Sequence, residues 1–377
     1  MKHLKHIGCL LLVALLSVMP AAASGAEAGE KSTVDVKEIV LGHMGDAYEW
    51  HILTWNGHEV AIPLPVIVKG EKSGWHCFSS ARLAEGESYE GFYINEAENG
   101  KIYEKLDNGQ EVRPLDLSIT KDVLQIWIVA LLMLVIFLGA ARWYRGRDCS
   151  DNAPKGFVGL VEMFVMMVYD DLIKPSIGEK HCKPYAPFLL TAFFFIFITN
   201  LMGLIPVFPG GANVTGNITI TFFLAFCVLL IVNIFGNKAY WKDIFWPEVP
   251  TWLKVPVPLM PVIELFGIFT KPFALMVRLF ANIMGGHAII LSLTCVIFIT
   301  CQLGVAIGSS LSFVSFLLMI FMNCLELLVA FIQAYVFTMF STVFTGLAQE
   351  DGHHPEKGDD HALAQPATPA APKGSAA

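Results

Sequence analysis

Four charged side chains interrupt an otherwise apolar stretch in the C-terminal half of this 377-residue chain. Between residues 262 and 348 the only Asp, Glu, Lys or Arg residues are Glu264, Lys271, Arg278 and Glu326. An arginine inside a bilayer costs at least ~2.5–3.5 kcal/mol, and its guanidinium group stays protonated in proteins. We therefore expect Arg278 to face a negatively charged partner and to act on an ion pathway.

The spacing of these residues places them on one face of a helix. Glu264, Lys271 and Arg278 repeat every seven residues, and Asn282 follows Arg278 by four. A neighbouring stripe consists of small residues, namely Ala274, Ala281, Gly285 and Ala288. Small side chains allow another helix to approach closely. Either a partner helix slides past this face, or the stripe is a site of static packing.

A second helix would bring further polar groups to the same depth. If the chain folds back at residues 306–308, His287 lies opposite Glu326 and Arg278 lies opposite Gln333. The residues that would share this face of the second helix are Asn323, Glu326, Ala330 and Gln333. A lone histidine can be a core residue, but an imidazole opposite a glutamate is typical of a proton relay, since it binds and releases protons near neutral pH.

The composition indicates an integral membrane protein. The chain is 55% hydrophobic and 15% charged, whereas soluble domains carry about 25% charged residues. Its net charge is −8 and it has no Lys/Arg-rich patch, which argues against nucleic-acid binding. It also has no glycine-rich phosphate loop and no Cys/His pattern with metal-site spacing. We expect no cofactor.

The N-terminal and C-terminal parts differ from the apolar centre. Residues 1–26 have the pattern of a signal peptide, although an uncleaved anchor remains an alternative. Residues 27–119 contain three Asn-Gly dipeptides, at positions 56, 99 and 108, which are strong hairpin signals. We expect a small β-rich exported domain there, of undetermined role. Residues 349–377 are acidic and then Ala/Pro-rich, which predicts a disordered cytoplasmic tail.

The membrane domain, residues 120–348, begins with three shorter spans. Val123–Ala141 is followed by a basic cluster that marks the cytoplasmic side, made up of Arg142, Arg145, Arg147 and Lys155. Phe188–Ile205 and Ile218–Phe235 are the next two spans. Between the first and the second span, Phe157–Ile173 has apolar residues at helical spacing broken by acidic ones. It fits a helix on the cytoplasmic interface better than a further span.

Two longer apolar segments follow, Pro261–Cys301 and Val305–Leu347. Each would be roughly 60 Å long as a helix, whereas a perpendicular span needs only ~20 residues. Each is therefore two spans or one inclined helix, and the absence of a polar turn favours inclined helices in a hairpin. The predicted fold class is thus an all-α polytopic membrane protein. It has five transmembrane helices, an interfacial helix and a β-rich exported domain.

The direction of each helix determines on which side of the membrane its polar residues lie. The first long helix starts in the cytoplasm, so Glu264 lies on the cytoplasmic side of Arg278, whereas His287 and Glu326 lie on the outer side. Titratable groups then stand on both sides of a cation that does not titrate. This arrangement describes two proton half-pathways separated by a fixed positive charge.

At this point the chain resembles subunit a of the F-type ATP synthase, the subunit 6 family. The similarity covers about residues 118–348. The motifs that carry it are Pro261–Glu264, Lys271-Pro272, Arg278–Asn282, Glu326–Gln333, Thr199–Pro206 and Asn217–Thr219.

The resemblance implies that Arg278 faces the proton-carrying carboxylate of the rotating c-ring. It further assigns Glu264 to the cytoplasmic half-channel and Asn282, His287 and Glu326 to the outer one, with Gln333 hydrogen-bonding near Arg278. In some bacterial members the glutamate and histidine stand at each other's positions, so the direction of each proton step is open. Lys271 either belongs to the pathway or extends to the cytoplasmic interface as a structural residue.

The resemblance also implies partners and a location. The partners are the c-ring proteolipids, the b-subunit peripheral stalk, membrane lipid and, indirectly, the F1 sector. The chain would be a non-catalytic subunit in a bacterial inner membrane. A secondary transporter that binds an anion at Arg278 is the alternative, although such folds have internal repeats that this sequence lacks. A structural membrane scaffold is a third possibility, which would leave the acid, base and cation at matched depth unexplained.

Overall fold

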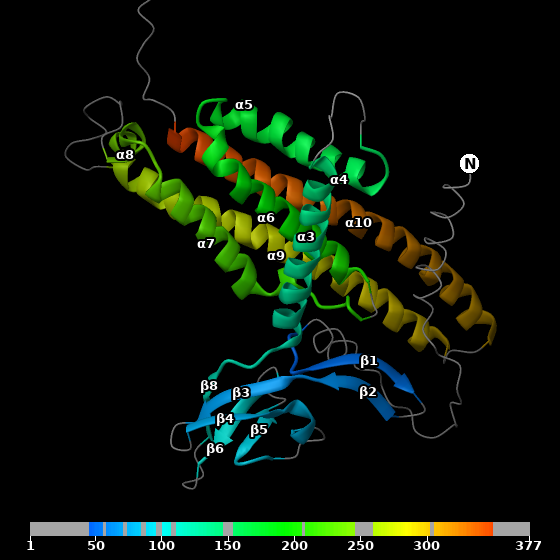
Figure 1. Cartoon of the computed structure of the whole chain (residues 1–377). Coiled ribbons are helices and arrows are strands. Elements are labelled where there is room, and N and C mark those ends of the chain that lie inside the picture. The colour runs from blue at the N-terminus through cyan, green and yellow to red at the C-terminus, as the bar shows by residue number, and fades with distance from the viewer. Residues whose placement is uncertain are drawn as a thin grey trace, which may run out of the picture.

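The structure is a computed structural model of the chain. It describes residues 45–55, 58–70, 74–83, 88–95, 100–106, 111–145, 154–205, 208–245, 259–301 and 305–349. The predicted signal peptide lies outside these residues, and so does the predicted C-terminal tail except Gln349, which is the last residue of a helix and not part of a disordered tail. Strands occupy the N-terminal part and helices the remainder, and the strands lie at one end of the helices (Figure 1).

The N-terminal part forms three small antiparallel sheets. The strands are β1 Glu49–Trp55, β2 His58–Pro63, β3 Pro65–Gly70, β4 Gly74–Ser79, β5 Phe92–Asn95, β6 Lys101–Lys105, β7 Glu111–Val112 and β8 Leu115–Asp116. They pair as β1-β2, β4-β3-β8 and β5-β6-β7. Their shared core contains the aromatic and aliphatic residues Tyr48, Val66, Val68, Phe78, Leu83, Phe92 and Ile102.

The Asn-Gly dipeptides mark the hairpins as predicted. Asn56-Gly57 separates β1 from β2, Asn99-Gly100 separates β5 from β6, and Asn108-Gly109 separates β6 from β7. The apolar run His58–Val68, however, is not one strand. It divides at Leu64, between Pro63 and Pro65, and its halves join different sheets. Proline cannot donate to a strand ladder, which explains a strand boundary at this point.

The described membrane part contains eight α-helices, one π-helical segment and one short 3₁₀ helix, η5 Val214–Gly216. Their bounds are α3 Lys121–Tyr144, α4 Phe157–Met166, η4 Met167–Ile173, α5 Lys174–Ile177, α6 Cys182–Gly203, α7 Ile218–Ile234, α8 Lys238–Phe245, α9 Leu259–Cys301 and α10 Val305–Gln349, α5 being a single turn. Four of them, α3, α6, α9 and α10, are long and apolar enough to cross a membrane. The bent pair α7–α8, which turns by 99°, is a fifth candidate.

Each of the two long apolar segments is one helix. The 43-residue α9 and the 45-residue α10 pack along each other, and both are steeply inclined relative to α3 (Figure 1). Pro272 lies within α9 without ending the helix. The two helices thus bring residues from distant parts of the sequence to the same depth, as the register argument requires.

The segment Phe157–Ile173 forms α4 and η4, which α5 continues. It packs against α6 and α10 at the end of α3 that is remote from the strands (Figure 1). It is not among the described helices that are long and apolar enough to cross a membrane. The main helical core beneath it combines α6, α7, α9 and α10, and its largest fully buried side chains include Phe193, Ile196 and Leu279.

Candidate functional site

His287 and Glu326 face each other across α9 and α10. The Nδ1 atom of His287 lies 3.2 Å from Oε1 of Glu326, and the Glu326 side chain is only 4% exposed. The predicted register of this pair is therefore the one that the structure adopts. The two atoms are close enough for an ion pair, but the angles at the donor and acceptor atoms are not those of a hydrogen bond. Neither carboxylate oxygen of Glu326 has a hydrogen-bond partner among the described residues.

Two glycines provide the space in which this pair lies. A Cβ atom added to Gly286 would be 3.1 Å from Glu326 Oε1. A Cβ atom added to Gly203, at the end of α6, would be 3.6 Å from His287 Nε2 and 3.4 Å from the carbonyl oxygen of Ala212. The backbones of α9 and α6 thus approach the two titratable groups closely. The stripe of small residues predicted from the sequence includes Gly285 but not Gly286.

A buried hydrogen-bond network fixes the helices beside the pair. Thr215 donates its hydroxyl to Asn200 Oδ1 at 2.7 Å, and Asn200 Nδ2 donates to the carbonyl oxygen of Ala330 at 3.4 Å. These bonds join the loop after α6 to α6 itself and to α10. Asn200 belongs to a motif that sequence analysis used only for the family resemblance, and the structure gives it a positioning role.

Arg278 lies near the middle of α9 on an exposed face. Its guanidinium carbon is 4.7 Å from the ring centroid of Phe340 on α10. No carboxylate within the described ranges forms an ion pair with it. The hydrogen bond to Gln333 that the resemblance implies is likewise not among its contacts, because Gln333 is buried whereas Arg278 points outward.

The same face of α9 carries the small residues predicted from sequence. Ala274, Ala281 and Gly285 are exposed, as is Asn282. Alanine and glycine have small side chains. In a membrane, a surface made of them would allow a neighbouring helix to approach the α9 backbone closely. The structure therefore combines an unpaired cation with a smooth helical surface around it.

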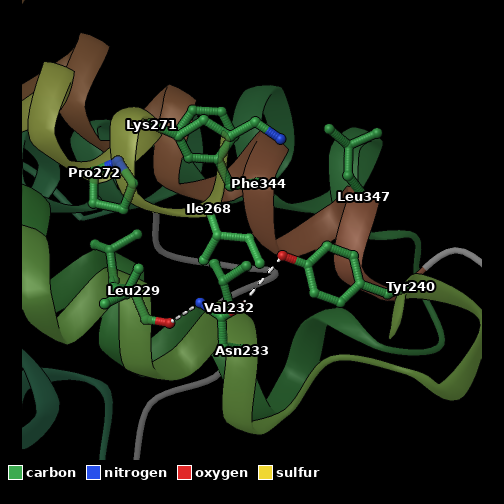
Figure 2. A pocket seen from close by; sticks show the side chains of 10 residues that line it. Leu229, Val232, Asn233, Tyr240, Ile268, Lys271, Pro272, Phe344 and Leu347 are labelled. Carbon is green, nitrogen blue, oxygen red and sulfur yellow. Dashed lines mark hydrogen bonds between the residues drawn. The ribbon is translucent and has the colours of Figure 1, made fainter. Parts of the chain in front are cut away.

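Toward the start of α9 the polar residues are separated from the His287–Glu326 pair. Glu264 is half-buried and Lys271 is exposed, with its amino nitrogen 5.7 Å from the ring centroid of Phe344. Figure 2 shows the pocket that Lys271 borders, which is lined by residues of α7, α8, α9 and α10. Its other polar side chains are Tyr240 and Asn233, whose hydroxyl and amide oxygen form a 3.4 Å hydrogen bond.

Sequence analysis missed an acidic residue at the start of α3. Asp122 is only 4% exposed, and its Oδ2 atom accepts a 2.9 Å hydrogen bond from Asn217 Nδ2, where Asn217 caps α7. The first span was predicted to begin at Val123, one residue too late to include it. A buried carboxylate beside an apolar span is the signal that could have identified it.

The chain was then compared with known proteins. Residues 123–346 match the family model for the ATP synthase A chain, and residues 39–117 match a family model described as Domain of unknown function (DUF8433). Subunit a 2 of the ATP synthase from Chlorobaculum tepidum is 41% identical over 259 residues, covering 67% of this chain and 68% of that protein. Subunit a from Myxococcus xanthus is 40% identical over 260 residues, covering 67% of this chain and 80% of that protein. The described geometry and these matches agree, and the chain belongs to the ATP synthase A chain family.

Proposed function

We propose that the chain is the proton-translocating stator subunit of an F-type ATP synthase, with Arg278 separating two half-channels. Family membership supports the proton-translocating role in the Fo sector. The chain is a component of that complex, and we assign it no ATP chemistry of its own. The secondary-transporter alternative has no support from these relatives.

The observation that carries the residue assignment is the exposed, unpaired guanidinium group of Arg278 among small residues. An unpaired arginine at membrane depth is costly, so its exposure argues for a partner on another chain. A carboxylate on a passing helix would satisfy the charge and be held in its ionised form beside it. The proton that it releases would leave by one half-channel, and reloading would occur from the other.

His287 and Glu326 form the inner end of the outer half-channel in this proposal. Their 3.2 Å separation and the burial of Glu326 support direct proton transfer between them. Asn282 lies between this pair and Arg278 along α9, on the exposed face. It would orient the incoming carboxylate by hydrogen bonding.

Glu264 serves the cytoplasmic half-channel, at the opposite end of α9 from the His287–Glu326 pair. Lys271 lies between Glu264 and Arg278, beside the pocket of Figure 2. Its contact with Phe344 supports a structural role in which the aliphatic stem packs on the ring and the amino group extends to the interface. Gln333, buried on α10, would line the route near Arg278 once the partner helix is in place.

We assign the chain to a bacterial inner membrane, with residues 27–119 on the outer side and the C-terminus in the cytoplasm. The proposed domains are residues 1–26 as a signal peptide, 27–119 as the exported domain, 120–348 as the membrane domain and 349–377 as a tail. Its direct partners are the c-ring proteolipids, the b-subunit stalk and lipid, and its link to the F1 sector is indirect.

Photo-crosslinking tests the proposed contact with the ring. A photoreactive amino acid at Ala281, on the same exposed face as Arg278, should crosslink to a small two-helix proteolipid that carries one mid-membrane Asp or Glu. The same amino acid at Leu131, which is 64% exposed on α3, should not crosslink to that proteolipid. A crosslink from Leu131 but none from Ala281 would contradict the assignment of the face.

A further inference from the structure

The β-rich domain packs against the membrane part of the chain, and one of its aromatic side chains is buried in this contact. Trp50 on β1 is 3% exposed and lies in a cluster with Ala212 and Val214, which are 0% and 1% exposed. Its ring also meets Phe208 edge-on, with 5.3 Å between ring centroids. Ala212, Val214 and Phe208 all belong to the loop between α6 and α7.

That same loop borders His287. The carbonyl oxygen of Ala212 lies against Gly203, and Gly203 in turn lies against Nε2 of His287. Asn213 Nδ2 donates to the sulfur of Met284 at 3.9 Å, one helical turn before His287 on α9. The loop is therefore a short physical connection between Trp50 and the proton-relay pair.

A second set of contacts fixes the domain to the start of α3. The backbone N–H of Lys121 donates to the carbonyl oxygen of Ala47 at 2.9 Å, and that of Asp122 donates to Asp46 Oδ1 at 3.2 Å. Residues 46 and 47 thus satisfy backbone donors that a helix N-terminus leaves without intrahelical partners. Because Asp122 also accepts a hydrogen bond from Asn217 at the start of α7, these contacts connect the domain, through α3, to the C-terminal end of the α6–α7 loop.

Glu326 on α10 is the ionisable side chain that forms an ion pair with His287. A charged residue at the junction between the domain and the membrane helices is Lys121, the first residue of α3. The amino group of Lys121 donates to the carbonyl oxygen of Gly45 at 3.2 Å, so residues of the exported domain also hold this cation in place.

We propose that the exported domain is a positioning element of the outer half-channel, and that Trp50 is the residue through which it holds the α6–α7 loop against the His287–Glu326 pair. The proposal rests on the assignment of that pair to the outer half-channel. A domain without this role would not require a tryptophan that is buried against the α6–α7 loop. The control residue is Trp75 of β4, which is 58% exposed and belongs to the same domain.

The test measures passive proton flux through the assembled complex in vesicles from which F1 has been removed. Trp50→Ala should lower the flux by roughly 2- to 30-fold, the usual range when a coupling network is broken. It should also shift the dependence of the flux on pH at the outer side, with the dependence on inner pH unchanged. Trp50→Phe should recover most of the flux, because an aromatic ring still covers the loop, and Trp75→Ala should behave as wild type.

Wild-type flux and an unchanged outer-pH profile in assembled Trp50→Ala complex would overturn the proposal. If that variant does not assemble, Val214→Ala removes the same contact from the loop side and must give the reduced flux. Failure of both to assemble, while Trp75→Ala assembles, would show that the contact serves folding alone and would also overturn it. Proton-driven ATP synthesis by the Arg278→Ala variant separates the two hypotheses: if this variant loses ATP synthesis while Trp50→Ala keeps wild-type proton flux, only the role of Trp50 is lost.

Discussion

The Nδ1 atom of His287 and the Oε1 atom of Glu326 lie 3.2 Å apart, although 39 residues separate them in the chain. They meet because α9 and α10 are long, continuous helices that pack side by side. The carboxylate is buried and has no hydrogen-bond partner among the described residues, so His287 is the group that faces its charge. In the proposed function, a proton that reaches one of these groups passes to the other.

We predict that His287→Ala or Glu326→Ala slows proton flux by on the order of 10²-fold, the scale typical for loss of a proton-transfer group. The double variant should be little slower than either single one, because the two groups act as a unit. Flux through F1-stripped vesicles measures this. A double variant whose loss is the product of the two single losses would indicate that the residues act independently.

Gly286 provides the room for the Glu326 carboxylate, so Gly286→Ala should reduce proton flux several-fold. The added methyl group would lie 3.1 Å from Oε1, which requires Glu326 to move. The substitution should not destabilise the helix itself, because alanine is a better helix former than glycine. Gly139→Ala on α3 is the control, since no described atom lies within 4 Å of the added Cβ and Gly139 is not on the face around Arg278. Equal flux in the two variants would contradict this role for Gly286.

Gly346 allows α10 to pack against the interfacial segment. A Cβ there would be 2.2 Å from the backbone carbonyl oxygen of Ser176, and a backbone atom cannot rotate away as a side chain can. We expect Gly346→Ala to cost about 1–3 kcal/mol, as other overpacking substitutions do. The thermal stability of the purified complex would report it. Gly139→Ala on α3, where nothing lies within 4 Å, should not lower the stability.

The stability of the β-rich domain should depend on pH through Tyr48. Burial first, and then the hydrogen bond that Tyr48 donates to Asp116, raise the pKa of its hydroxyl well above the usual value. Stability from the neutral hydroxyl is present below the unfolded pKa of about 10 and declines as the pH rises above it. One pH unit above that value, the loss is about 1.4 kcal/mol.

Tyr48→Phe tests this dependence, because phenylalanine cannot ionise. The variant should be less stable than wild type at pH 8, where it lacks the hydrogen bond, and the difference should narrow by about 1.4 kcal/mol at pH 11. Pulse proteolysis of the β-rich domain in denaturant, within the solubilised complex, measures the difference in stability between wild type and variant at pH 8 and at pH 11. A difference that stays constant between the two pH values would exclude Tyr48 as the cause.

The sequence predicted the elements around the site better than the contacts between them. Apolar length alone identified α9 and α10, and counting from the turn placed His287 opposite Glu326. The same counting did not predict that Arg278 would lie over Phe340, because a side chain of this length reaches along the helix to a residue two turns beyond Gln333. Register fixes backbones, whereas rotamers fix the ends of long side chains.

Contacts between distant segments were beyond sequence reasoning for a similar reason. Nothing in the local pattern of Trp50 distinguishes it from exposed Trp75, since both stand in short strands of the same domain. Their difference arises only when β1 meets the α6–α7 loop. The hydrogen bond between Asp122 and Asn217 was likewise not predictable from the sequence, because the two residues are 95 positions apart.

The most direct test of the central claim is proton-driven ATP synthesis by vesicles that contain the Arg278→Ala variant, with assembly of the complex verified beforehand. Removal of the guanidinium group takes away the fixed charge that separates the half-channels, so we predict an assembled complex with no ATP synthesis. Synthesis at the wild-type rate in that complex would contradict the account.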